Sequence, residues 1–141
     1  MALASVLAVI ILSSCSAEPQ KIAYGKDACD ECMMTIMDPK FGGEILTKKG
    51  KAFKFDDAHC LAQFLKSAKV KEADIAQTVF LNHQNGDQFL DAKTAQFVVS
   101  PELKSPMNSN AAAFESKAAA ETAAAKVAGK VLDWNTLFNS L

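Results

Sequence analysis

Short apolar runs separated by turn residues organise the middle of the chain. Two β-hairpins are predicted from these runs, over residues 44–55 and 77–92. The turn of the first ends in Gly50, which tolerates a positive φ, and the turn of the second carries Asn85-Gly86, a common hairpin dipeptide. The apolar run at residues 95–100 fits either a further strand or a short helix.

Three helical segments are predicted around these strands. The first follows the first hairpin and begins at Asp56 or Asp57, either of which is a good N-cap. The second is alanine-rich, begins at Ser116 and stops at Gly129, and a last helical turn begins at Asp133 after a short strand. Two successive hairpin-plus-helix (ββα-like) units predict one small α+β domain.

The N-terminus has the pattern of an export signal. Residues 2–12 are apolar except for one serine and are too short to span a bilayer, as is typical of a signal-peptide core. They run into Leu-Ser-Ser-Cys, which resembles a bacterial lipobox and predicts lipidation of Cys15; cleavage near Ser16-Ala17 as an ordinary secretory signal is the alternative. The expected organisation is a lipoprotein signal peptide at residues 1–14, a lipidated tether at 15–23 and a domain at 24–141.

Composition narrows the class of partner. The chain carries a formal charge of −1 at pH 7, from 15 basic and 16 acidic residues. This balance offers no basic surface, so we expect no nucleic-acid partner. The expected protein is a near-neutral domain of the bacterial cell envelope, anchored to a membrane by its lipid and facing the periplasm.

The cysteines of the domain indicate a reactive or metal-binding thiol. Cys29, Cys32 and Cys60 are an odd number, so an oxidising compartment cannot pair them all within one chain. At least one thiol is free, bound to metal or shared between molecules. Three of the five methionines in the chain, Met33, Met34 and Met37, follow Cys32 closely.

Cysteine thiolate and methionine thioether are both suitable ligands for Cu(I). Cu(I) is a soft ion that favours these sulfur groups, whereas Zn(II) takes cysteine, histidine and carboxylate. Methionine sulfur binds copper without first losing a proton, which matters where thiols are easily oxidised. A redox Cys-x-x-Cys or a zinc site has no use for the methionines.

Other interpretations of the same residues stay open. The methionines also fit core packing. Cys29 and Cys32 form a Cys-x-x-Cys pair that fits a periplasmic thiol-disulfide oxidoreductase, although no strand clearly leads into it. Cys29, Cys32, His59 and Cys60 form an acceptable structural zinc set. His59 equally fits a solvent-facing helix position, and His83 a turn.

Residues 24–138 resemble the NosL family, the lipoprotein copper chaperones that accompany nitrous oxide reductase. The resemblance rests on several motifs in order along the chain. They are "CDECMM" at residues 29–34, "FDDAHC" at 55–60, "FLDAKTAQFV" at 89–98, "SPMNSNAAAF" at 105–114 and "AGKVLDW" at 128–134. Two departures are visible: Met33 replaces the usual glycine between Cys and Met, and Asn108-Ser109-Asn110 stands where Gly-Tyr-Gly is expected.

The resemblance implies a function. Cys32 and Met34 take the places of the family's Cys and Met, and Met107 is retained as a third ligand, so these residues are expected to form a Cu(I) site. The expected protein is a non-enzymatic carrier that delivers copper for maturation of nitrous oxide reductase in denitrification, with a membrane transporter complex as its handover partner. Met33, Met37, Cys29, His59 and Cys60 remain further candidate ligands.

Overall fold

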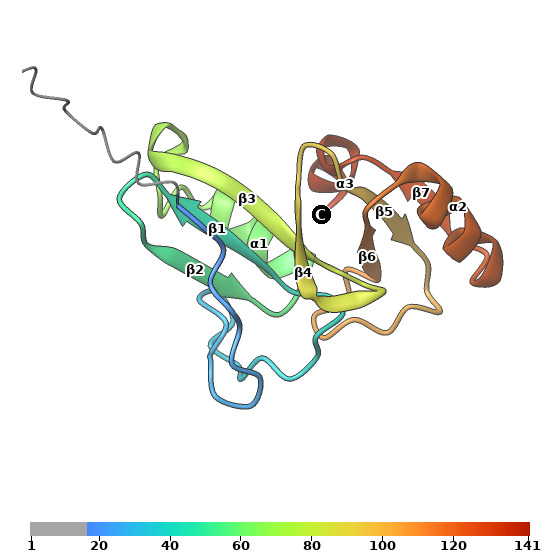
Figure 1. Cartoon of the computed structure of the whole chain (residues 1–141), viewed down its shortest axis with the longest axis horizontal. Helices are drawn as coiled ribbons and strands as arrows, with labels where there is room; N and C mark the ends of the chain where they lie inside the picture. Colours follow the sequence, from blue (N-terminus) through green and yellow to red (C-terminus); the bar gives the residue numbers. More distant parts are fainter. Residues whose placement is uncertain (1–16) are drawn as a thin grey trace, which may run out of the picture.

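The computed structural model describes residues 17–141, which mix one sheet with helices (Figure 1). The expected α+β class is confirmed. The predicted signal peptide and lipidated Cys15 lie outside the described residues. The elements are β1 (Gly43–Thr47), β2 (Ala52–Phe55), α1 (Ala58–Lys66), the 3-10 helix η1 (Glu72–Asp74), β3 (Ile75–Asn82), β4 (Asn85–Asp91), β5 (Gln96–Val99), β6 (Ala111–Phe114), α2 (Lys117–Lys126), β7 (Lys130–Leu132) and α3 (Trp134–Ser140).

The described strands form one seven-stranded sheet in the order β2-β1-β3-β6-β5-β7, with β4 paired to β3. Its two halves are antiparallel, β2-β1-β3-β4 and β6-β5-β7. They join at a short parallel contact between Asn82 of β3 and Ala113 of β6. The helices α1 and α2 pack mainly against different halves, as Figure 1 shows.

The order of elements differs in part from the predicted pair of ββα-like units. The first unit, β1-β2-α1, is present as expected. In the second, β5 and β6 come between the β3-β4 hairpin and α2. The run at residues 95–100 thus supplies a strand, and the four-residue strand β6 consists of apolar residues that are all buried.

The second hairpin turns earlier than predicted. Asn82 pairs with Asn85, so His83 and Gln84 make the turn and Gly86 belongs to β4. A Cβ at position 86 would lie 2.5 Å from the carbonyl oxygen of Pro39, so glycine is needed there for close approach of another segment.

The helix starts follow the predicted caps. Asp57, Ser116 and Asp133 each accept a backbone N–H of the first turn. The predicted stop at Gly129 is wrong in detail, because α2 ends at Lys126 and Ala128 adopts the left-handed φ of 46°. A Cβ on Gly129 would lie 2.7 Å from a methyl group of Val98, so packing against β5 excludes a side chain there.

Two buried clusters stabilise the domain. The larger lies between α1 and the sheet and includes Phe55, Leu61 and Phe80. The smaller lies under α2 and includes Val98 and Phe114. Burial of apolar side chains of this size contributes about 1.5–3 kcal/mol each. No helix within residues 17–141 is long and apolar enough to cross a bilayer.

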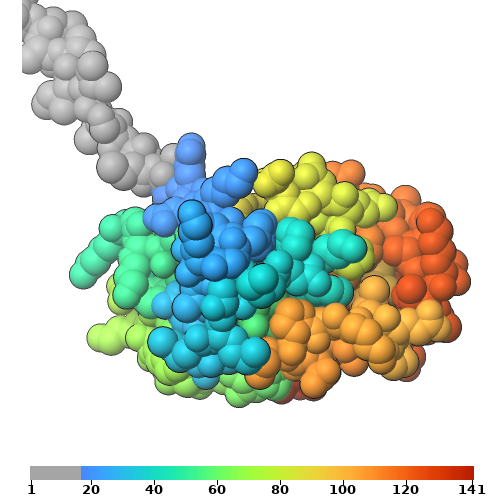
Figure 2. Space-filling view, turned by 90° about the horizontal axis from the view of Figure 1, so that it is seen from below, coloured from blue at the N-terminus to red at the C-terminus, as the bar shows by residue number. Residues whose placement is uncertain are grey.

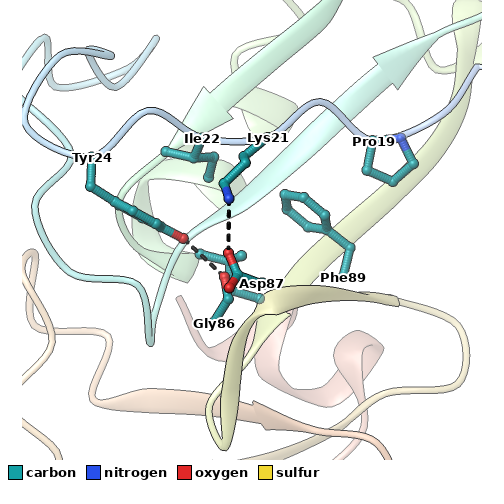
Figure 3. Close-up of a pocket in the computed structure, with 8 residues that line it drawn as sticks. Pro19, Lys21, Ile22, Tyr24, Gly86, Asp87 and Phe89 are labelled. Carbon is teal, nitrogen blue, oxygen red and sulfur yellow. Dashed lines mark hydrogen bonds and ion pairs between the residues drawn. The ribbon is translucent and has the colours of Figure 1, made fainter.

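The N-terminal segment is fastened to the sheet before the loops begin. The N–H of Gln20 donates to the carboxylate of Glu44 at 2.9 Å, and Ile22 is buried in the larger cluster. Figure 3 shows the Tyr24 hydroxyl pointing to the Gly86 carbonyl, 3.1 Å away, across a small pocket of about 180 Å³. Ordered contacts with the domain therefore begin within residues 17–23.

Candidate metal centre

Four side chains meet at one end of α1. The ligand atoms of Cys29, Cys32, Asp56 and Cys60 all lie within 4.8 Å of one another. Cys29 and Cys32 come from the loop before β1, Asp56 follows β2, and Cys60 lies in the first turn of α1. The sharp passage from strand to helix at residues 55–58 brings Asp56 and Cys60 to the same place, because both flank the start of the helix.

Backbone hydrogen bonds hold the cysteine loop rigidly. The Cys29 N–H donates to the Met34 carbonyl at 2.8 Å, and the Met33 N–H donates to the Cys29 carbonyl at 2.9 Å. The loop is tied to β2 by the Asp30 N–H, which donates to the Lys54 carbonyl, and by the Lys54 N–H, which donates to the Asp30 carboxylate at 2.7 Å. Cys29 is therefore bonded within its own loop, and the next residue, Asp30, bonds that loop to β2.

The thiols are electrostatically unequal. The Cys60 thiol donates to Cys29, which lowers the pKa of Cys29 to about 6. The same shared hydrogen bond raises the pKa of Cys60, since Cys60 keeps the proton. Burial raises the pKa of Cys32, whose thiol donates to the Asp56 carboxylate with Sγ 3.6 Å from Oδ2. The shared proton of the Cys29 and Cys60 pair thus favours Cys60, and Cys29 is the thiol of the group that loses its proton most easily.

The cluster has a closed interior and one accessible edge. Cys29 is 0% exposed and Cys60 is 1% exposed, whereas Cys32 is only partly buried. Figure 2 shows the chain around residues 30–40, in light blue to cyan, beside the orange chain around residues 100–110 on one face of the molecule. Cys32 is thus the thiol at which a metal ion would enter.

The predicted methionine ligands differ in burial. Met107 is half-buried and packs against the larger core cluster together with Cys32. Its N–H donates to the carboxylate of Asp57, the neighbour of Asp56. Met34 is fixed through its carbonyl, but its side chain is 57% exposed. Met33 and Met37 are exposed as well.

The two histidines lie outside the group of donor atoms. His59 contributes its backbone N–H to the Asp57 cap, and its ring is not a member of the cluster. The close group of donor atoms thus has Asp56 where the predicted zinc set has His59. The His83 ring packs against Phe41 and Phe114, with centroids 5.2 and 5.5 Å away.

Sequence reasoning missed Asp56 as a member of the site. Its position before the helix favoured a capping role, which Asp57 fills instead. The available signal was the doubled aspartate in Phe-Asp-Asp, because only one of two adjacent carboxylates is able to cap while the other points elsewhere. The side chain of Asp56 is 3% exposed.

Comparison with known proteins identifies the family of the chain. The NosL family model matches residues 20–140, nearly the whole described chain. The chain belongs to the NosL family. The fold is similar to the crystal structure of the copper chaperone NosL from Shewanella denitrificans, with a TM-score of 0.73 and 22% sequence identity over 85% of this chain and 95% of that chain. A comparison with curated proteins gives no match.

Proposed function

We propose that the protein is a Cu(I) chaperone, and the observation that carries this is a buried group of three sulfur donors with one accessible edge. Cys29, Cys32 and Cys60 offer thiol sulfur, and the exposed residues Met33 and Met34 follow Cys32 directly in the chain. Soft donors of this kind favour Cu(I) over Zn(II). NosL family membership and the fold likeness to a copper chaperone support the same conclusion.

Within the centre we assign Cys32 as the anchoring ligand, with Met34 and Met107 as thioether partners. Cys32 is the partly exposed thiol of the group, and the backbone of Met107 is bonded to Asp57, the neighbour of Asp56. Binding of Cu(I) displaces the Cys32 proton, and the adjacent Asp56 carboxylate is placed to accept it. Cys29 and Cys60 lie behind Cys32, buried, with their sulfur atoms within 4.8 Å of that of Cys32.

The arrangement suits transfer rather than catalysis. A carrier passes its metal by ligand exchange, so it needs a partly exposed ligand and a small ligand set. Family membership implies a non-enzymatic, metal-binding role. We infer that copper is delivered for maturation of nitrous oxide reductase, through a membrane transporter complex, in the periplasm.

Lipidation of Cys15 would keep the carrier beside that membrane complex. Folded contacts begin at Gln20, whose N–H is bound to Glu44. A fully extended chain spans at most about 3.6 Å per residue. The few residues between Cys15 and Gln20 would therefore keep the domain close to the bilayer surface.

The Cys₃Asp donor set makes zinc the second candidate. Three thiolates and a carboxylate are acceptable ligands for tetrahedral Zn(II). A disulfide exchange enzyme is less well supported, because reactive Cys-x-x-Cys pairs commonly sit at a helix N-terminus. The pair here is followed by an irregular loop and not by a helix.

The deciding experiment is an anaerobic titration of the reduced domain with Cu(I) and, separately, Zn(II), each against a chromophoric chelator of known affinity. We expect about one tightly bound Cu(I) and far weaker Zn(II) binding, because thioethers contribute little to a zinc site. Zinc affinity that matches copper affinity, with a sulfur-rich tetrahedral spectrum, would favour the Cys29, Cys32, Cys60 and Asp56 zinc site.

A further inference from the structure

The surface beside the metal centre carries an unusual group of side chains. Met33, Met34 and Met37 are 74%, 57% and 68% exposed, and they are the exposed large hydrophobic residues of the described chain. All lie within one short loop, next to the accessible thiol Cys32. A folded domain commonly exposes single apolar residues, but a cluster beside a functional site indicates interaction.

The loop fixes these side chains outward. Ile36, between Met34 and Met37, is 0% exposed, and its N–H donates to the Asp27 carbonyl at 2.9 Å. Ala28 and Thr35 form an antiparallel bridge across the base of the loop. With Cys29 and Ile36 buried, the methionine side chains between and after them have no place in the core.

Met33 stands where the backbone would favour glycine. Its φ is 64°, in the left-handed region that disfavours residues with a Cβ. Burial does not compensate, since the side chain is largely exposed. The fold therefore gains nothing from methionine at this position, and the thioether is available to something outside the domain.

The buried thiols restrict copper exchange to the accessible side of the centre, where Cys32 lies. A donor molecule cannot place its own ligands against Cys29 or Cys60, which are essentially inaccessible. Ligand exchange requires donor and acceptor to hold the ion at the same moment. An exposed neutral thioether binds Cu(I) without deprotonation and weakly enough to release it.

We propose that Met33 and Met37 form a second, transient Cu(I) site on the surface, which takes the ion from a partner with sulfur-rich ligands and relays it to Cys32. This rests on the proposed copper-carrying function and adds the route by which the ion enters. The copper stays Cu(I) throughout: one sulfur–copper bond forms as another breaks, and no electron is transferred. The resting site and the relay then use different methionines.

The test measures the rate of Cu(I) uptake and the equilibrium affinity for Cu(I) separately. The domain with Met33→Leu and Met37→Leu keeps its apolar surface but lacks both sulfurs. In stopped-flow transfer from the Cu(I)–bicinchoninate complex, we expect uptake to slow by at least about fivefold, while the equilibrium affinity stays within about twofold of the parent. Thermal unfolding of both proteins checks that the loop is intact.

Two matched variants sharpen the outcome. Met33→Gly removes the sulfur and relieves the left-handed backbone, so it should also slow uptake while unfolding at no lower temperature than the parent. Met107→Leu, in the resting site, should lower equilibrium affinity instead. Uptake by the double variant at the parent rate overturns the relay, as does a loss of affinity that matches the loss of rate. A parent that binds no Cu(I) at all shows instead that the proposed function has failed.

Discussion

The backbone N–H of Met107 donates to Oδ2 of Asp57 at 2.8 Å, across 50 positions of sequence. The other oxygen of the same carboxylate accepts the His59 N–H at 2.8 Å and caps α1. Asp57 is 0% exposed. One buried side chain therefore both starts the helix that carries Cys60 and holds the Met107 loop beside the metal centre.

Replacement of Asp57 by alanine should destabilise the fold and weaken metal binding together. Loss of an N-cap costs about 0.5–2 kcal/mol, and a buried N–H without a partner costs about 1–3 kcal/mol. We expect a total of about 2–4 kcal/mol in urea unfolding followed by circular dichroism. Cu(I) affinity of the folded variant should fall, because Met107 is no longer fixed.

Ser116→Ala is the matched control, since Ser116 caps α2 in the same way through the Ala119 N–H. It should cost about 1 kcal/mol and leave Cu(I) affinity unchanged. If Asp57→Ala has no greater effect on copper binding than Ser116→Ala, the Met107 loop is not part of the centre.

The Cys29 thiolate should depend on Cys60. Cys60→Ala removes the thiol that donates to Cys29, so the Cys29 pKa should rise from about 6 toward its ordinary value of 9.0. Cys60→Ser keeps a hydroxyl donor and should preserve most of the shift. Ultraviolet thiolate absorbance of the reduced protein, followed against pH, measures this directly. An unchanged titration in Cys60→Ala would mean that another group holds the Cys29 charge.

Features that depend on residues close together in the sequence could be predicted, whereas features that depend on contacts between distant segments could not. The caps at Asp57, Ser116 and Asp133 and the presence of both hairpins, though not the turn of the second, were predictable because they depend on neighbouring residues. The role of Gly86 was not, because it is set by the approach of Pro39 from a distant loop.

The metal centre likewise has residues that the sequence predicted and residues that only the fold revealed. The motifs pointed to the cysteines and methionines, and the structure does gather the three thiols. Asp56, rather than His59, joins the three thiols, and the sequence did not show this because side-chain direction at a strand-to-helix junction depends on tertiary packing. The exposure of Met33 and Met37 likewise required the folded loop.

Glu44 should make folding stability depend on pH. It is fully buried in β1, and burial raises its pKa from 4.5 to about 7. The folded state thus holds a proton that the unfolded state has released, so stability should fall as pH rises from 4.5 to about 7 and then level off. The shift of about 2.5 in pKa corresponds to a total change of about 3–4 kcal/mol.

Glu44→Gln removes this titration and keeps an oxygen for the Gln20 N–H. Its unfolding free energy, measured in urea at several pH values, should lack the decline seen in the parent and exceed the parent value above neutral pH. A variant that is less stable than the parent at high pH, with the same pH dependence, would show that Glu44 is not the titrating group.

Lipidation at Cys15 is a prediction from the lipobox, at a position outside the described residues. Cys15→Ala should leave the precursor unmodified in cells fed labelled palmitate and should release the domain from the membrane fraction. A variant that still takes up label and sediments with membranes would refute the lipobox assignment.

The final prediction separates two ligand sets for copper, Cys32 with Met34 and Met107, or the three thiols alone. Leucine at Met34 or Met107 keeps volume and apolarity and deletes the sulfur, and such exchanges usually cost less than about 1.5 kcal/mol of stability. Folding should therefore survive. Equilibrium Cu(I) affinity should fall more than about tenfold for either variant, since each tenfold corresponds to about 1.4 kcal/mol and a lost ligand exceeds that.

Cys32→Ser should be more severe than either methionine variant, because it removes the accessible anionic ligand. Met33→Leu and Met37→Leu should leave the equilibrium affinity close to that of the parent, and competition against a chelator under anaerobic conditions ranks all five. The opposite ranking of Cu(I) affinities would support the other ligand set. If the Met34 and Met107 variants bind Cu(I) like the parent while Cys29→Ser abolishes binding, the copper is held by the buried thiols, and the methionines serve only its approach.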